Sequence, residues 1–178
     1  MAIELITNRS FNSSKYRHYI NESNSVLHCH HYAALYTQLA DDAGELCDGP
    51  VILYETAAES FYPILKEYFE KNNIDELDER IKIIEQYWAF SGMGQLMITN
   101  SSVEGGEAEM PFSHVDSGWI KKWGNRDEAV NFITLGYLAA AFAAIHNLPS
   151  NSFEATETQS IVAGAEKSQF KITKNRKG

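Results

Sequence analysis

The chain has 178 residues, of which 44% are apolar and 12% aromatic, and it carries a formal net charge of −9 at pH 7. This length and apolar content predict one domain with a sizeable core and are too small for two. The acidic balance argues against a nucleic-acid or anionic-membrane surface, because phosphate binding needs clustered Lys and Arg. The one basic cluster is the tail with Lys171, Lys174, Arg176 and Lys177, which we expect to be solvated.

The sequence predicts a cytoplasmic protein without a membrane span. No run approaches the roughly 20 apolar residues that a spanning helix needs. The start, Met1 to Ile6, lacks a charged segment followed by an apolar signal core. Cys29 and Cys47 form no CxxC pair and are too few for a disulfide framework, so we expect free thiols in a reducing compartment.

The first half of the chain predicts a polar arm followed by three helices. Residues 1–23 are polar and lack periodicity, so we expect them to form an arm. Apolar residues then recur at helical spacing in three segments, which predicts helices over about 25–42, 49–69 and 75–91. Pro63 is expected to kink the second helix or to split it.

The second half predicts two hairpins around one helix. Asn125-Arg-Asp-Glu128 has capping-box spacing before a long, Ala-rich apolar helix that ends near Asn147. Alternation with a period of two predicts strands over residues 95–99, 108–114, 152–162 and 168–173, with turns at 104–107 and 164–167. We therefore expect an α+β domain with an antiparallel four-stranded sheet and about four helices, because parallel neighbours would each need a crossover.

The last strand pair carries a spaced motif made of Glu157, Ser160, Gly164, Ser168 and Phe170. It resembles the C-terminal signature of the 4-vinyl-reductase domain, a hydrocarbon-binding module, which runs Glu, two residues, Cys, three residues, Gly, three residues, Cys, one residue, Phe. Both cysteine positions are serine in this chain. A thiolate is a soft metal ligand and a strong nucleophile, whereas a serine hydroxyl is neither without an activating partner. We therefore expect no cysteine-bound metal at this place.

Two earlier segments extend the likeness over about residues 26–173. The segment 89–98 resembles the family's glycine-bearing passage into its first strand, and 132–141 resembles the glycine-containing part of its long helix. The resemblance implies a single small-molecule-binding domain over residues 24–174, with a tail at 175–178.

The same fold belongs to transport-complex subunits and haem-type nitric-oxide sensors, which implies a homodimer with an apolar pocket between sheet and helices. More distantly, the chain resembles the aminothiazoline-carboxylate hydrolase family, which has a similar tail. The pattern of that tail also includes the cysteines that this chain lacks.

Aromatic and Met residues supply most of the candidate ligand contacts. At these spacings such residues are mostly core, although some must line any pocket. Glu157 is expected to turn inward as a buried hydrogen-bond anchor, or alternatively to contact a ligand. The candidate ligand-binding residues are Trp88, Met93, Met97, Met110, Phe112, Trp119, Tyr137, Phe142 and Glu157.

His28-Cys29-His30-His31 is the densest group of metal-capable side chains. On a helix, His28 and His31 would share a face, so both imidazoles could bind zinc or another transition metal. A tight site needs a third ligand, for which His114 or a carboxylate such as Glu55 or Glu59 is a candidate. The alternative is that these histidines start an amphipathic helix and hydrogen-bond to the backbone.

Two other groups invite a catalytic interpretation. Cys29 is a candidate nucleophile, because a helix N-terminus lowers a thiol pKa and His114 could serve as base, although a buried inert thiol is the simpler expectation. Ser113, His114 and Asp116 are the residue types of a hydrolytic triad, but along a strand Ser113 and His114 face opposite ways, which argues against it.

Three hypotheses follow. The first is a binding module, a sensor or carrier whose sheet and Ala-rich helix enclose a mostly apolar small ligand. The second is a small hydrolase that uses Cys29 or a metal held by His28, His31 and His114. The third is an assembly subunit, which would show an extended apolar surface instead of an internal site. The lack of a complete catalytic constellation favours binding over catalysis.

Overall fold

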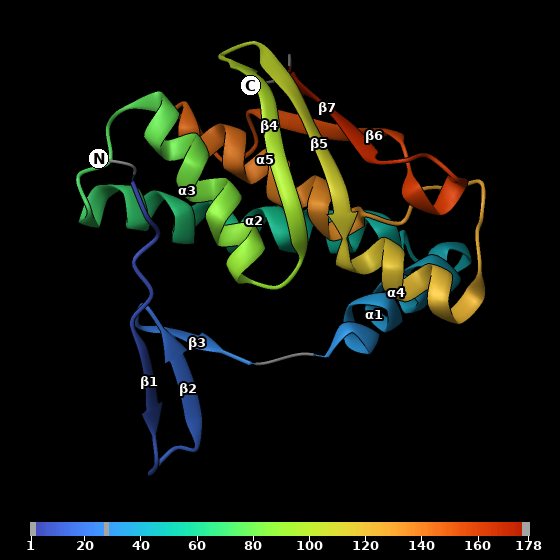
Figure 1. Ribbon diagram of the computed structural model, residues 1–178, viewed down its shortest axis with the longest axis horizontal. Helices are drawn as coiled ribbons and strands as arrows, with labels where there is room; N and C mark the ends of the chain where they lie inside the picture. Colours follow the sequence, from blue (N-terminus) through green and yellow to red (C-terminus); the bar gives the residue numbers. More distant parts are fainter. Residues whose placement is uncertain (1–2, 27–28, 176–178) are drawn as a thin grey trace.

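The computed structural model describes residues 3–26 and 29–175 as an α+β fold (Figure 1). The described part of the chain contains five α-helices: α1 (His30–Asp42), α2 (Gly49–Lys71), α3 (Leu77–Phe90), α4 (His114–Trp123) and α5 (Phe132–Ile145). Its strands are β1 (Arg9–Asn12), β2 (Arg17–Ile20), β3 (Ser23–Ser25), β4 (Gly94–Ser102), β5 (Gly105–Ser113), β6 (Phe153–Gln159) and β7 (Ser168–Lys174). Two 3-10 turns, η1 (Ala43–Glu45) and η2 (Ile161–Ala163), complete the order.

The main sheet has four antiparallel strands in the order β4-β5-β7-β6, so two hairpins meet along β5 and β7. This confirms the predicted α+β class and the four-stranded sheet. The register places Phe170 of β7 between Ala108 of β5 and Glu157 of β6. Helix α5 lies between this sheet and α2, as Figure 1 shows.

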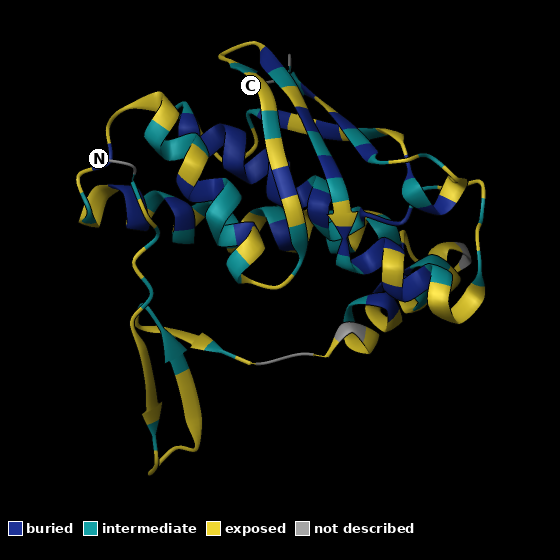
Figure 2. Cartoon of the chain, in the orientation of Figure 1, coloured by how far each residue is buried: buried dark blue, intermediate teal, exposed yellow. Residues whose placement is uncertain are grey.

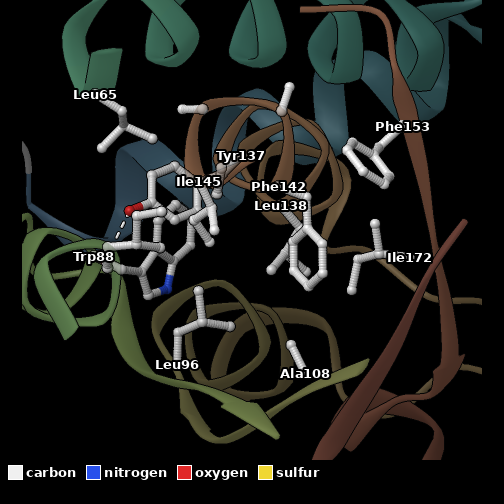
Figure 3. Packing of buried hydrophobic residues seen from close by; sticks show 14 of the residues in the cluster. Leu65, Trp88, Leu96, Ala108, Tyr137, Leu138, Phe142, Ile145, Phe153 and Ile172 are labelled. Atoms are coloured by element: carbon white, nitrogen blue, oxygen red, sulfur yellow. Dashed lines mark hydrogen bonds between the residues drawn. The ribbon is translucent and has the colours of Figure 1, made fainter. Parts of the chain in front are cut away.

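Helix α5 is the centre of the core. Every residue from Gly136 to Ile145 is buried (Figure 2), which explains why this segment is apolar on all its faces. Trp88 from α3 and Phe153 from β6 pack around it, as the close view in Figure 3 shows. The Ala-rich composition lets α2 and the sheet approach the α5 backbone closely.

The predicted arm contains a small sheet of its own. Strands β1, β2 and β3 pair antiparallel and project away from the helices (Figure 1). The predicted helix start near residue 25 is wrong, because the backbone of Ser25 pairs with His18 and α1 begins only at His30. Three backbone hydrogen bonds connect the arm to the body: Leu5 N–H donates to Gln86 Oε1 at 2.6 Å, Ile6 N–H donates to Tyr68 Oη at 2.7 Å, and the Ile3 carbonyl accepts from Gln86 Nε2 at 3.1 Å.

Helix α2 runs through Pro63 without a break. A proline removes one i to i−4 hydrogen bond, here the bond that would reach Glu59. Both residues are exposed, so the carbonyl left without its helical donor faces water. Of the two predicted outcomes the split is therefore wrong, since packing against α5 holds the helix on its other side, and the kink stays a prediction.

Helix α4 was not predicted from sequence. The return strand ends at Ser113, whose Oγ caps α4 by accepting the N–H of Asp116 at 3.0 Å. The predicted start of the long helix at the capping-box spacing of 125–128 is wrong as well, because α5 begins at Phe132. The turn of the first hairpin lies at Val103 and Glu104, one or two residues before its predicted position.

Helices α5 and α2 come close together at Gly136, and a substitution there tests how tightly they pack. A Cβ at this position would clash with the carbonyl oxygen of Tyr54 and lie 2.8 Å from Ala57 Cβ. We expect Gly136→Ala to lower the free energy of unfolding by about 1–3 kcal/mol, because overpacking forces the helices apart. Urea denaturation checks this. Gly44→Ala is the control, because a Cβ there meets nothing within 4 Å; equal midpoints for the two variants would contradict the close packing.

Candidate functional site

A buried cluster of polar side chains joins four elements at one end of the sheet. Its members come from the start of α4, the residue that precedes α5, the end of β6 and the start of β7. They are Ser113, Asp116, Asn131, Glu157, Ser160 and Ser168, and all are buried except Glu157, which is partly buried.

The amide of Asn131 lies between the two carboxylates. Its Nδ2 donates to both Asp116 oxygens at 3.1 Å and to Glu157 Oε1 at 2.8 Å. One NH₂ group has two hydrogens, so one serves each carboxylate. Asn131 therefore links α4 to β6.

Two serines fix the orientation of this arrangement. Ser113 Oγ donates to Asn131 Oδ1 at 3.1 Å while it accepts the N–H of Asp116. Ser168 Oγ donates to Asp116 Oδ2 at 3.0 Å and accepts the N–H of Ile161 at 3.1 Å. Each of these hydroxyls thus both donates and accepts, as a buried hydroxyl should.

Two atoms at the edge of the cluster lack a partner. Glu157 Oε2 and Ser160 Oγ are buried and make no hydrogen bond. The Ser160 hydroxyl is outside hydrogen-bonding geometry but near enough to lower the pKa of Glu157 slightly. A proton on Oε2 would give this pair a donor and an acceptor.

Burial sets the charge state of the cluster. It raises the pKa of Asp116, although hydrogen bonds from Asn131, Ser113 and Ser168 oppose the shift. It also raises the pKa of Glu157 to about 7; the hydrogen bond from Asn131 lowers it and the charge of Asp116 adds to the rise. Near neutral pH, Glu157 is therefore about half protonated.

The signature residues Glu157, Ser160 and Ser168 meet here, and Glu157 accepts a partly buried hydrogen bond from Asn131. Sequence reasoning missed Asp116 and Asn131 as their neighbours. The signal for Asp116 was present, because Ser113-His-Val-Asp116 has the Ser/Thr-x-x-acid spacing of a helix start. Reading that segment as a strand hid the signal; on α4, Ser113 is a cap and not a nucleophile.

A second candidate site is aromatic and lies beside α5. The Trp88 ring contacts the ring of Tyr137 at 4.5 Å between centroids, and Phe61 meets Tyr137 edge-on at 4.9 Å. Tyr137 Oη donates to the Ile84 carbonyl at 2.7 Å, but Trp88 Nε1 is buried and has no acceptor. Figure 3 shows both rings within the core. A buried donor without a partner is costly and marks this place as a candidate for a polar atom of a ligand.

An open groove of about 860 Å³ separates the arm from α2 and α3. Phe61, Tyr87 and Phe90 line it on the body side, and Phe11 and Ile20 are among the residues that line it on the arm side. Phe61 also contacts the Trp88 ring at 6.4 Å between centroids. Phe61 therefore belongs both to the wall of the groove and to the ring cluster around Trp88.

The nine candidate ligand residues do not surround one space. Trp88, Met110, Tyr137 and Phe142 belong to the main core, whereas Trp119 packs in a smaller cluster with residues of α4 and η2. Met93 is half-buried and touches both clusters. Met97 and Phe112 are exposed, at 36% and 70% of their surface, and Glu157 belongs to the polar cluster.

The candidate metal residues lie at two helix starts. His31 is exposed on α1, His114 is half-buried on α4, and His28 lies outside the described residues. The shared helical face predicted for His28 and His31 includes a residue outside the described ones and stays a prediction; the described part of α1 begins at His30. Among residues 3–26 and 29–175, no three His, Cys, Asp or Glu side chains are grouped to hold a metal ion.

The expectation of a buried Cys29 is also wrong. This cysteine is exposed at the N-cap of α1, with Sγ 3.7 Å from His31 Nδ1. A thiol beside an imidazole is one part of a cysteine nucleophile. Cys47 is exposed as well. The Cys29 hydrolase therefore stays a prediction.

Comparison with known proteins gives a fold. No protein-family model matches the chain, and no curated protein matches it in sequence. Among solved structures, it is similar to the phenol-responsive sensory domain of the transcription activator PoxR, crystallised with phenol. The TM-score is 0.75 at 11% identity, over 93% of this chain and 84% of the other.

Two further structures share the fold. One is a vinyl-4-reductase family protein from Methanocaldococcus jannaschii, with a TM-score of 0.53 and 16% identity over 85% of this chain and 84% of the other. The second is a trafficking protein particle complex subunit 3 from Naegleria fowleri, covalently bound to palmitic acid. Its TM-score is 0.54 and its identity 12%, over 83% of this chain and 95% of the other.

The chain thus has the fold of the 4-vinyl-reductase domain, of a sensory domain and of a trafficking subunit, as its sequence motifs implied. Identities this low establish the fold alone. No helix within the described residues combines the length and apolarity that crossing a membrane requires.

The pKa of Glu157 predicts a dependence of stability on pH. The folded state holds the proton up to about pH 7, while the carboxyl of the unfolded chain has its ordinary pKa of 4.5. Stability from this group is therefore fully present below about pH 4.5 and is lost as the pH rises to about 7. The loss amounts to at most about 3 kcal/mol. Chemical denaturation between about pH 4 and about pH 8 measures it.

Glu157→Gln should flatten this profile, because the amide keeps an acceptor for Asn131 and can donate to Ser160 without titrating. The control is Glu154→Gln, an exposed position on the same strand, which should keep the profile of the unchanged protein. A Glu157→Gln profile as steep as that of the unchanged protein would assign the dependence to other groups.

Proposed function

We propose that this chain is a small-molecule-binding domain, a sensor or carrier, whose ligand is a small aromatic compound with an oxygen acceptor. The observation that carries the proposal is the buried Nε1–H of Trp88, which has no acceptor. A ligand hydroxyl or carbonyl oxygen beside this group would remove the cost of the unpaired donor. The surrounding rings of Phe61 and Tyr137 would contact an aromatic ligand.

The groove lies next to this ring cluster, although Trp88 is not among the residues that line it. Phe61 and Tyr87 line the groove and pack edge-on at 6.2 Å between centroids, and Phe61 also touches Trp88. Both rings are only partly buried. We infer that a ligand would reach Trp88 from the groove only after the Phe61 side chain turns to another rotamer.

The structural neighbours support this proposal at the level of ligand class. One was crystallised with phenol and another carries palmitic acid. Both ligands combine an apolar body with an oxygen, which is the chemistry that the Trp88 surroundings favour. Phenol is the smaller and the aromatic one, so it is the first probe to use.

The other two hypotheses stay predictions with less support. The hydrolase has the contact of Cys29 with His31 in its favour. The assembly subunit has the fold of the trafficking subunit and the exposed side chains of Leu46 and Phe112. Neither accounts for the unpaired donor at Trp88.

Phenol binding tests the proposal directly. We expect isothermal titration calorimetry to show saturable binding of phenol to the unchanged protein. Trp88→Phe should weaken it about tenfold, since a net hydrogen bond of about 1.4 kcal/mol is lost. Trp123→Phe is the matched control, because Trp123 is an exposed tryptophan on α4. This variant should bind phenol with the affinity of the unchanged protein. Equal affinities for all three proteins would remove Trp88 from the site.

We also propose that the chain forms a homodimer through the arm. Strands β1 to β3 have three or four residues each, and Phe11 and Tyr16 are 52% and 83% exposed. A sheet this small needs an apolar partner surface to be stable. A second copy of the arm or of its groove would supply one, and the resemblance to the 4-vinyl-reductase domain implies a dimer.

Sedimentation velocity measures this association. The unchanged protein should sediment as a dimer, and Phe11→Glu should shift it toward the monomer, because a charge would enter an apolar contact. Val103→Glu is the control, because Val103 is equally exposed, at 52%, and lies at the tip of the β4-β5 hairpin. A monomer for the unchanged protein would end the dimer proposal without affecting the ligand site.

A further inference from the structure

We propose that the hydrogen-bonded cluster of Ser113, Asp116, Asn131, Glu157 and Ser168 is a metal-free tie, in which the amide of Asn131 takes the place of the cysteine-bound metal that the 4-vinyl-reductase resemblance implies. The tie joins α4, α5, β6 and β7 by hydrogen bonds alone. Its residues Glu157 and Ser168 stand at signature positions of the implied metal site, but they interact through hydrogen bonds and not through metal coordination.

The donor set does not fit a soft metal. Structural zinc sites almost always have four ligands, which are thiolates or imidazoles. The cluster offers two carboxylates, one carboxamide and hydroxyls, and the two signature positions that would carry thiolates are Ser160 and Ser168. Oxygen donors of this kind prefer hard cations such as Mg²⁺ and Ca²⁺.

The geometry does not favour a hard cation either. A cation shared by Asp116 and Glu157 would have to lie between their oxygens. Asn131 Nδ2 occupies that place, 3.1 Å from each oxygen of Asp116 and 2.8 Å from Glu157 Oε1. Its two hydrogens carry positive partial charge toward the carboxylates, so a cation there would meet a donor instead of an acceptor.

The network also opposes reversal of this amide. Turning the carboxamide around would present Oδ1 to a cation, but it would turn Nδ2 toward Ser113. Ser113 Oγ already accepts the N–H of Asp116 at 3.0 Å and directs its own hydrogen to Asn131 Oδ1. The helix cap of α4 therefore holds the amide in the orientation that excludes a metal.

The tie connects segments that are distant in sequence. Ser168 bridges Asp116, which is 52 residues away, and the backbone of Ile161. Asn131 reaches Glu157 across 26 residues. Hydrogen bonds to charged acceptors are stronger than neutral ones, and loss of a buried partner leaves a buried charge unpaired.

Metal analysis and thermal unfolding of the intact chain test the proposal. The protein purified without chelator should contain no stoichiometric transition metal. Its Tm should not change with EDTA or with added Zn²⁺, Ca²⁺ or Mn²⁺. One equivalent of any of these metals in the protein, or a Tm that falls with EDTA, would overturn the proposal.

Two variants change the donor set in opposite directions. Asn131→Asp removes both donors and adds a third carboxylate, so its Tm should fall in EDTA and rise on addition of Ca²⁺ or Mn²⁺. The exposed Asn151→Asp is its control and should show no such rise. If Asn131→Asp has the Tm of the unchanged protein and no response to cations, the amide is not the tie.

The triple variant Asn131→Asp with Ser160→Cys and Ser168→Cys removes the amide donor and restores thiolates at the signature positions. With Glu157 and Asp116 it offers at least four ligands, so it should gain one equivalent of Zn²⁺ by elemental analysis. Failure of the folded triple variant to bind Zn²⁺ would count against the idea that the tie occupies a metal's place. Phenol binding is measured separately, so either result leaves the proposed function to its own test.

Discussion

The burial of α5 on every side is the constraint from which the rest of the structure follows. This helix fills the space between the sheet and α2, which explains its lack of a polar face and the need for Gly136 where α2 comes closest. The N-terminal half of this helix, with the residue that precedes it, contributes a residue to each of the two candidate sites. Asn131, the residue before its first turn, enters the polar cluster, and Tyr137, nearly two turns further on, packs its ring against Trp88.

The two sites differ in how completely their polar groups are satisfied. In the polar cluster the donors of Asn131, Ser113 and Ser168 all have acceptors, and the atoms left unpaired are Glu157 Oε2 and the Ser160 hydroxyl, which differ by one proton from a possible donor and acceptor pair. In the aromatic site the unpaired atom is a lone donor, Trp88 Nε1, within apolar surroundings. A largely satisfied network stabilises the fold, whereas an unpaired donor in apolar surroundings gives a ligand something to bind.

Periodicity in the sequence was sufficient for the long elements and insufficient for the short ones. The four strands of the main sheet and the long α5 follow patterns that local sequence carries. Helix α4 has ten residues with a glycine inside it, so its pattern was too short to outweigh the alternation that precedes it. Asp116 and Asn131 meet Glu157 only through the tertiary fold, and no spacing along the chain encodes that meeting. Glu157 itself was found because its motif resembles a family signature.

The position of Phe61 links two equilibria. Its ring belongs to the wall of the groove beneath the arm and to the ring cluster around Trp88. The same wall includes Tyr68, whose hydroxyl accepts a hydrogen bond from the backbone N–H of Ile6 in the arm. A guest that displaces Phe61 therefore alters the surface on which the arm rests. Thermodynamic reciprocity then requires the arm, and anything that binds it, to change the affinity for the guest by the same factor.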